Sequence, residues 1–387
     1  MTEKSARRAP GEGGLYRRSD GRWEGRVTAG YSPEGKRQRR KVVARTKREA
    51  AERLELLKRE VNAGLSGEAA RWTVADWLER WVKDEAAATV RPRTLAVYEQ
   101  ILRTHLIPAL GHHRLKKLEP SHIRAYFLMK MTAGLKPRTI GNHYIVLRRA
   151  LEIATRYQYI ERNVARLVSP PRAERYEAQP LGQEEIGKFL HAARGHSLEA
   201  LFIVAASTGM RQGEVLGLAW PQVDLDGGYV RVSAGLSRYA GAFHRGEPKT
   251  VNSRRTIAIP LPVVEALRHH RDRQTLAERR GREARTWVGN EWGLVFTGAL
   301  GQPLGARSVY SEFLGVLKSA GVRLIRFHDL CHGAATFLLA QGIAMKVVQE
   351  ILGHAQMSMT ADLYSHVVPE LQREAADRMG AVLFASR

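Results

Sequence analysis

The sequence has one cysteine, few acidic residues and no long apolar run. A single cysteine excludes a disulfide within the chain, which is typical of proteins in a reducing compartment. A membrane-spanning helix needs roughly 18 to 20 consecutive apolar residues, and no stretch approaches that length. The first residues, MTEKSARRAPGEGG, also lack the apolar core of a signal peptide. From these absences we expect a cytoplasmic protein.

The shortage of acidic residues leaves a strong positive charge. The 387 residues include 62 Lys and Arg against 39 Asp and Glu, a formal net charge of +23. This excess indicates a polyanionic partner, and nucleic acid is the first candidate because each neutralised phosphate releases counterions. A membrane surface or an acidic protein is a weaker alternative. The length predicts two or three domains.

Residues 1–65 predict a small domain of three strands and one helix. Turn signals at Asp20-Gly21 and at residues 33–35 separate runs of alternating character, which indicates three antiparallel strands. Thr46 and Glu49 then form a capping box for a helix that Gly64 ends.

Basic residues crowd these strands around one tryptophan. A ribbon of this kind can lie in a DNA groove, and a solvated basic face is the alternative. The residues concerned are Arg22, Trp23, Arg26, Lys36, Arg37, Arg39, Arg40 and Lys41.

Residues 72–168 predict an all-helical domain. Trp72 and Trp77 stand at the positions of a hydrophobic staple around a capping box formed by Thr73 and Asp76. Further helices are expected at residues 94–107, stopped by Pro108 and Gly111, and at 121–131 and 139–157. Cations near the helix starts and loops are placed to bind phosphates, although each taken singly is more often a solvated charge. They include Arg91, Arg93, Lys116, Lys117, Lys136 and Arg138.

Residues 178–387 predict a mixed, mainly helical α+β domain after a Pro-Pro linker at residues 169–175. Helices are expected at 184–193, 198–207, 212–218 and from Pro262 onward, and strands at 229–233 and 255–259. An amphipathic tail helix is expected at 371–383.

Two polar sites stand out early in this domain. Arg211 follows the Gly209 turn and precedes a helix on which Glu214 lies three residues later, so a guanidinium sits beside helix N-terminal amides that can bind a phosphate oxygen. A surface ion pair is the alternative. Lys249 lies between two strand-like runs, and a lysine there can donate a proton if its pKa is lowered.

The stretch from 326 to 367 concentrates reactive side chains. His328, Cys331 and His332 have the spacing of one helix face, and His354 and Tyr364 follow. A metal site with His354 as fourth ligand is one interpretation, but the stretch has no paired C-x-x-C element.

These elements in this order resemble the tyrosine recombinase (phage integrase) family. The resemblance rests on R-x-x-E after a glycine turn, a hairpin lysine, H-x-x-C-H at the start of an apolar helix, L-G-H and Y-x-H. It implies an arm-type DNA-binding domain, a helical core-binding domain and a tyrosine recombinase catalytic domain. The implied catalytic positions are Arg211, Lys249, His328, Cys331, His354 and Tyr364, with Glu214 and His332 in support.

The resemblance also implies a reaction and partners. A tyrosine hydroxyl attacks a DNA phosphate to form a 3′-phosphotyrosyl bond, without metal or cofactor, during integration or excision of a mobile element. Four protomers would act on two duplexes, with the C-terminal tail docked on a neighbour and a DNA-bending accessory protein as a further expected partner. Such a protein would associate with the nucleoid.

Cys331 departs from the family pattern, which has a second arginine there. A thiol offers one weak donor and no charge, so we expect a crippled or trapped enzyme that still folds and binds DNA. A catalytically silent DNA-binding or architectural protein is the second hypothesis, and a metal-dependent nuclease built on the histidine and cysteine cluster is the third.

Overall fold

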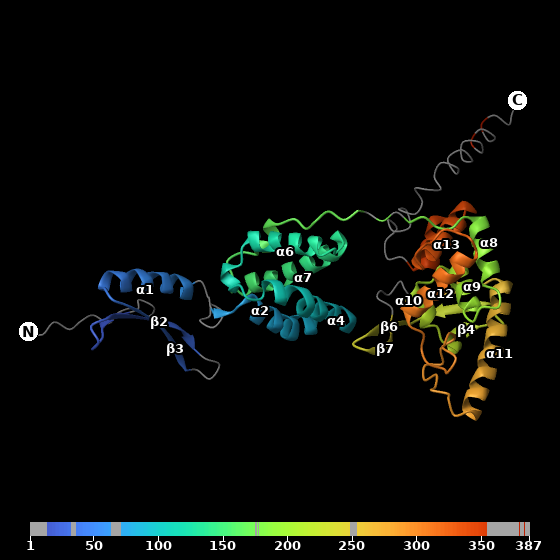
Figure 1. Ribbon diagram of the computed structural model, residues 1–387, viewed down its shortest axis with the longest axis horizontal. Coiled ribbons are helices and arrows are strands. Elements are labelled where there is room, and N and C mark those ends of the chain that lie inside the picture. The colour runs from blue at the N-terminus through green and yellow to red at the C-terminus, as the bar shows by residue number, and fades with distance from the viewer. Residues whose placement is uncertain are drawn as a thin grey trace, which may run out of the picture. The chain divides into compact units, whose positions relative to one another are not determined.

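The computed structural model describes residues 14–31, 36–62, 71–174, 176, 178–247 and 254–353, with the isolated positions 379 and 383 (Figure 1). The chain divides into two compact units, Met1–Arg175 and Tyr176–Arg387. The first unit contains two separate hydrophobic cores, one in its N-terminal sheet and one in its helical part.

The N-terminal part is a three-stranded antiparallel sheet covered by one helix, as predicted. Its strands are β1 (Gly14–Arg17), β2 (Trp23–Tyr31) and β3 (Arg37–Ala44), in the order β1-β2-β3, and α1 (Lys47–Asn62) packs on the sheet. The helix approaches closely at Gly25, where a Cβ atom would lie 3.1 Å from the Cβ of Leu54. Alternate residues of β2 and β3 therefore face the helix, and the others face away from it.

The helical part of the first unit contains α2 (Val74–Arg80), α3 (Ala87–Thr89), α4 (Pro92–Ile101), α5 (Ile107–Leu110), α6 (Pro120–Thr132) and α7 (Pro137–Arg156). The predicted capping box of Thr73 and Asp76 is confirmed, and the ring of Trp72 stacks on Trp77 with centroids 6.1 Å apart. The indole of Trp77 is buried and donates to the carbonyl of Ala150 at 3.0 Å. This hydrogen bond connects α2 to α7.

One of two predicted stop signals in this part is wrong. The helix expected to stop at Pro108 and Gly111 continues past Pro108 to Leu110, directly before Gly111, through a π-helical turn at Leu102–Leu106. In that turn the amide of Ile107 donates to the carbonyl of Leu102, five residues back. The wider turn accommodates a proline, which has no amide hydrogen to donate.

The second unit surrounds a small antiparallel sheet with helices. The sheet has the order β4-β5-β8, formed by β4 (Val223–Asp224), β5 (Tyr229–Val232) and β8 (Arg255–Ala258). Its helices are α8 (Gln183–Ala192), α9 (Glu199–Thr208), α10 (Gln212–Leu216), α11 (Leu261–Glu283), α12 (Ala306–Ser319), α13 (His328–Ala340) and α14 (Met345–Leu352). The main core of the unit contains the buried rings of Phe189, Phe202, Phe296 and Phe313.

A separate hairpin of β6 (Gly235–Tyr239) and β7 (Ala242–Gly246) lies between β5 and β8 in the sequence, and the strand prediction missed it. Its turn places Ala240 and Gly241 at φ of 48° and 80°. Both residues have positive φ, as a two-residue hairpin turn that follows the strand twist requires, but Ala-Gly is a weak sequence signal for such a turn. The predicted tail helix falls almost wholly outside the described residues. Within the described part of the chain, no helix combines the length and the apolar character needed to cross a membrane.

Candidate active site

Part of the predicted catalytic set is described by the structure. Arg211, Glu214, His328, Cys331 and His332 fall in described segments, and all come from the region where α9, α10, α13 and α14 meet. Three further predicted catalytic residues, Lys249, His354 and Tyr364, lie outside the described residues.

Arg211 stands at the N-terminus of α10 because α9 ends sharply before it. Gly209 has a φ of 62°, in the left-handed region, and a Cβ atom there would lie 2.5 Å from the Cδ2 of Leu352. The backbone amide of Arg211 donates to Glu214 at 3.0 Å, and its Nη1 donates to the same carboxylate at 2.9 Å. Its Nη2 lies 3.4 Å from the carbonyl oxygen of Gly353. The guanidinium is therefore fixed on two sides, with 33% of the side chain still exposed.

Glu214 holds a second arginine that sequence reasoning missed. Arg255, the first residue of β8, donates from Nη2 to Glu214 at 3.0 Å and from Nε to the carbonyl of Ile351. Only 6% of the Arg255 side chain is exposed, and Glu214 is buried. One carboxylate thus pairs with a buried and an accessible guanidinium, leaving a net positive charge for an anionic ligand. The only sequence signal was the Arg254-Arg255 pair after the hairpin lysine.

A pocket of about 540 Å³ adjoins Arg255 at the ends of β5 and β8. Its lining includes Arg231, Arg254 and Arg255 beside Glu247. Lys249, the predicted proton donor, lies in the sequence between two lining residues, Glu247 and Arg254, and is itself outside the described residues.

Cys331 is buried on α13, with 2% of the residue exposed. Burial raises the pKa of its thiol to about 12, against the opposing influence of Arg211 and Arg255. The thiol is therefore neutral at physiological pH. It packs in a small apolar cluster that contains Ala335, Leu339, Val348 and Leu352. The expected effect on the reaction rate of losing a positive charge at position 331 stays a prediction. The thiol of Cys331 lies near Arg211 and Glu214.

His328 and His332 are both in α13, with ring centroids 4.7 Å apart in an edge-to-face arrangement. Burial lowers the pKa of His328, and the nearby Arg211 and Arg326 lower it further. Burial and the neighbouring His328 lower the pKa of His332 to about 4. Both imidazoles are therefore uncharged near neutral pH. Nδ1 of His332 is buried without a hydrogen-bond partner in the described part of the chain.

The metal-site interpretation receives no support from this geometry. Although His328, Cys331 and His332 share α13 as predicted, no three His, Cys, Asp or Glu residues in the described segments are grouped to hold a metal ion. The proposed fourth ligand, His354, is outside those segments.

Asp329 forms a second polar cluster at the start of α13, which the sequence did not reveal. The carboxylate is fully buried and accepts hydrogen bonds from the Arg326 amide at 2.9 Å, from Arg326 Nη2 at 2.8 Å and from the Tyr176 hydroxyl at 2.8 Å. Burial alone would raise the pKa of Asp329, but the bonds from Arg326 and Tyr176 bring it below its ordinary value. Asp329 is therefore an ion beside His328.

The predicted DNA-binding residues of the N-terminal sheet do not all face the same way. In the register of β2 and β3, Arg26 lies opposite Lys41 and Thr28 lies opposite Arg39, and these residues are on the face away from α1. Trp23 and Arg40 alternate with these and lie on the helix side, where Lys47 of α1 stands 5.4 Å from the Trp23 ring. Arg37 donates to the Thr28 hydroxyl, and Arg22 is paired with Asp20 in the first turn. Side chains alternate between the two faces along a strand. The open face therefore carries only some of the basic residues that the sequence suggested for DNA contact.

Four of the six predicted cations of the helical part lie at the starts of long helices. Arg91 and Lys136 directly precede the first residues of α4 and α7, and Arg93 and Arg138 lie in the first turns of those helices. All four are exposed. Contact with DNA at these helix starts remains a prediction.

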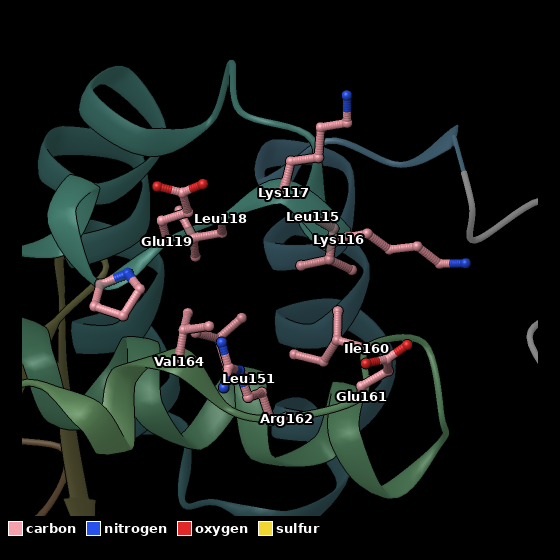
Figure 2. A pocket seen from close by; sticks show the side chains of 11 residues that line it. Leu115, Lys116, Lys117, Leu118, Glu119, Leu151, Ile160, Glu161, Arg162 and Val164 are labelled. Carbon is pink, nitrogen blue, oxygen red and sulfur yellow. The ribbon is translucent and has the colours of Figure 1, made fainter.

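A pocket of about 680 Å³ also lies in this helical part (Figure 2). Figure 2 shows the Lys116 and Lys117 side chains extending away from its apolar lining, which includes Leu118, Leu151 and Ile160. The lining contains no histidine, cysteine or tyrosine, so the pocket lacks the groups that the predicted chemistry needs.

Comparison with known proteins decides the family. Residues 179–370 match the phage integrase family, and residues 73–132 match the phage integrase N-terminal SAM-like domain. An integrase of Saccharopolyspora erythraea is 30% identical to this chain, with all of both chains covered. This chain belongs to the phage integrase family. A XerC-like tyrosine recombinase of Caldanaerobacter subterraneus is likewise 30% identical, with 91% of this chain and 94% of that protein covered.

Solved integrase structures share the fold. The Tn1549 transposon integrase in complex with transposon right end DNA is 20% identical, with a TM-score of 0.66, 80% of this chain covered and 100% of that chain. A lambda integrase dimer bound to a core site is 20% identical, with a TM-score of 0.58, 75% of this chain covered and 95% of that chain. The predicted fold class, with a small N-terminal three-stranded sheet, a helical middle part and a mixed, mainly helical tyrosine recombinase fold, is confirmed for this integrase. The roles of individual residues stay predictions.

Proposed function

We propose that this integrase cleaves and rejoins DNA strands through Tyr364, for integration or excision of a mobile element. The tyrosine oxygen attacks a DNA phosphorus atom, a 3′-phosphotyrosyl bond forms, and the bond to the 5′-oxygen breaks. Attack by a 5′-hydroxyl from a partner duplex reverses the step and exchanges the strands. The phosphodiester energy is kept in the covalent link.

The observation that carries this proposal is the clamp of Arg211, Glu214 and Arg255 beside α13. Attack on phosphorus adds negative charge to the nonbridging oxygens, and a guanidinium held in place before the reaction stabilises that charge. Arg211 meets this need because its fork is fixed by Glu214 and yet one third of its side chain is exposed. Arg255, buried against Glu214, acts by holding the carboxylate.

The other predicted residues complete the chemistry. His328 is uncharged near pH 7 because burial lowers its pKa, so it can accept the proton of the tyrosine hydroxyl. Lys249 is assigned the proton that the leaving 5′-oxygen requires, and His354 a hydrogen bond to the phosphate. In this assignment Cys331 contributes no charge, and a rate about 10² to 10³ below that of an enzyme with arginine there is expected.

We further propose that four protomers assemble on two duplexes, with core and arm-type DNA sites bound by separate domains, tail exchange between neighbours and a DNA-bending accessory protein. A lambda integrase tetramer bound to a Holliday junction, 21% identical with a TM-score of 0.58, supports the four-protomer part of this proposal. The basic face of the N-terminal sheet supplies the arm-type contacts in this proposal.

The test is covalent capture on a nicked half-site, with the original chain and with Cys331→Arg. Half-sites come from DNA that the protein selects from a random pool. We expect a slow, Tyr364-dependent covalent complex in the original chain and a faster one in Cys331→Arg, with Tyr364→Phe forming none. The original chain and Cys331→Arg both keep Tyr364. If neither of them attaches covalently to DNA, the recombinase assignment fails.

A catalytically silent DNA-binding protein is the second candidate, favoured by the buried neutral thiol at position 331. It predicts salt-sensitive DNA binding with no covalent complex even after arginine is restored.

A further inference from the structure

Tyr176 makes an unusual contact for a residue at the beginning of a domain. Half of the residue is exposed, but its hydroxyl donates at 2.8 Å to the fully buried carboxylate of Asp329, which is 153 residues away in the sequence. Its ring also covers the guanidinium of Arg326, whose central carbon lies 3.3 Å from the ring centroid. One tyrosine thus contacts both members of the Arg326–Asp329 ion pair.

This cluster is attached directly to the helix that carries the predicted catalytic histidine. Asp329 follows His328 in the first turn of α13, and Arg326 precedes it by two residues. Arg326 binds the carboxylate through both its backbone amide and its guanidinium, closing a tight loop at the start of the helix. A buried carboxylate stays ionised only when donors surround it, and Tyr176 supplies the donor that comes from outside this loop.

The cluster also contributes to the electric field at His328. Burial and Arg211 lower the pKa of that histidine most, Arg326 lowers it further, and Asp329 raises it. Because the two charges act in opposite directions, their effect depends on how both side chains are held. The ring of Tyr176 restricts Arg326, and its hydroxyl restricts Asp329.

We infer that Tyr176 is a positioning residue for strand cleavage: it fixes the Arg326–Asp329 pair and, through that pair, the orientation of His328. This inference rests on the proposed function, because only a recombinase makes His328 a proton acceptor. Tyr176 also directly follows the linker at residues 169–175, so the chain enters the second unit at a contact with the active-site helix.

The test compares Tyr176→Phe with Tyr157→Phe in the full chain. Tyr157 is a matched control, since it is 43% exposed and its hydroxyl donates to Glu85 at 2.9 Å in the helical part of the first unit. Three quantities are measured: the single-turnover cleavage rate on the nicked half-site, the half-site Kd, and the NMR signals of the histidine rings in selectively labelled protein. Both substitutions are repeated in the Cys331→Arg background.

We expect Tyr176→Phe to cleave about 10-fold more slowly, as for loss of a hydrogen bond to a charged group, with an unchanged Kd and displaced signals of His328 and His332. Tyr157→Phe should match the parent in all three. Unchanged cleavage and unchanged histidine signals in Tyr176→Phe would overturn the inference. Equal losses of binding and cleavage with a lower Tm would also overturn it, because they indicate a merely structural role. If no parent chain cleaves DNA, the proposed function fails, whereas the histidine signals still decide whether Tyr176 orients His328.

Discussion

Arg255 and Arg211 share one carboxylate: each donates to Glu214 at 3.0 Å or less, although Arg255 is buried and Arg211 is accessible. The two guanidinium groups also bind carbonyls two residues apart at the end of α14, Arg255 that of Ile351 and Arg211 that of Gly353. The next residue is His354. The clamp therefore connects the predicted phosphate-binding arginine to the backbone that leads into another predicted catalytic residue.

Arg255→Lys should reduce cleavage without weakening DNA binding. Lysine keeps the charge but cannot bind Glu214 and the Ile351 carbonyl with one planar fork, so Glu214 and Arg211 lose their fixed geometry. We expect a loss of about 10- to 100-fold in the single-turnover rate. Arg254→Lys is the control, because the neighbouring Arg254 is 55% exposed and pairs with the exposed Glu247. Equal rates in the two variants would remove Arg255 from the site.

Cys331→Arg should lower the stability of the free protein and raise the cleavage rate. The new guanidinium enters a buried position beside two other arginines and a single glutamate, and without DNA that charge is poorly compensated. We expect the free energy of unfolding of the free protein to fall by about 1 to 3 kcal/mol. Cleavage should become at least about 100-fold faster. Urea unfolding and half-site kinetics measure the two effects. Cys331→Ser, which adds no charge, should show no gain in rate, and such a gain would refute the missing-arginine explanation.

The pH dependence of cleavage should report the lowered pKa of His328. A histidine that accepts a proton is active while uncharged, and burial lowers its pKa below the ordinary 6.5. The cleavage rate is therefore expected to hold as pH falls to 6.5 and to drop only below it. Rates measured between pH 5 and 8 in the Cys331→Arg background test this. A fall that begins above pH 7, or an acid limb that persists in His328→Gln, would rule out this assignment.

Local signals predicted much of the fold, and distant contacts explain what was missed. The capping box of Thr73 and Asp76 and the pair of Arg211 and Glu214 each span three residues, so the sequence displays them directly. The partner of Glu214 on β8 is 41 residues away, and no local pattern links them. The strand pattern gave the three N-terminal strands, but it did not show which basic residues α1 covers, because that depends on which face the helix occupies.

Arg39→Ala should weaken binding of the N-terminal sheet to DNA in a salt-dependent way. Arg39 lies on the face of the sheet away from α1 and is exposed. Losing one phosphate contact should reduce the slope of log K against log salt by about 1. Arg48→Ala is the control, since Arg48 lies on α1 and its side chain is 91% exposed. Its substitution removes the same charge from another surface. Equal changes in slope for both variants would show that net charge alone, and not the open sheet face, determines binding.

The helical part of the first unit should lose stability in acid through His143. This residue is 2% exposed, its Nδ1 is 2.8 Å from the Tyr126 hydroxyl, and its ring stacks on His105 at 4.4 Å. Burial, with the nearby His105, lowers its pKa from 6.5 to about 4. Because the unfolded chain binds this proton more readily than the folded one, the stabilising contribution is complete above pH 6.5 and is lost as pH falls toward 4. Hydrogen exchange of the α7 amides in the full chain measures this loss. His143→Asn should flatten the dependence between pH 6.5 and 4, whereas His112→Asn, at an exposed position in the same unit, should leave it unchanged. An equally steep dependence in His143→Asn would show that other groups cause the acid sensitivity.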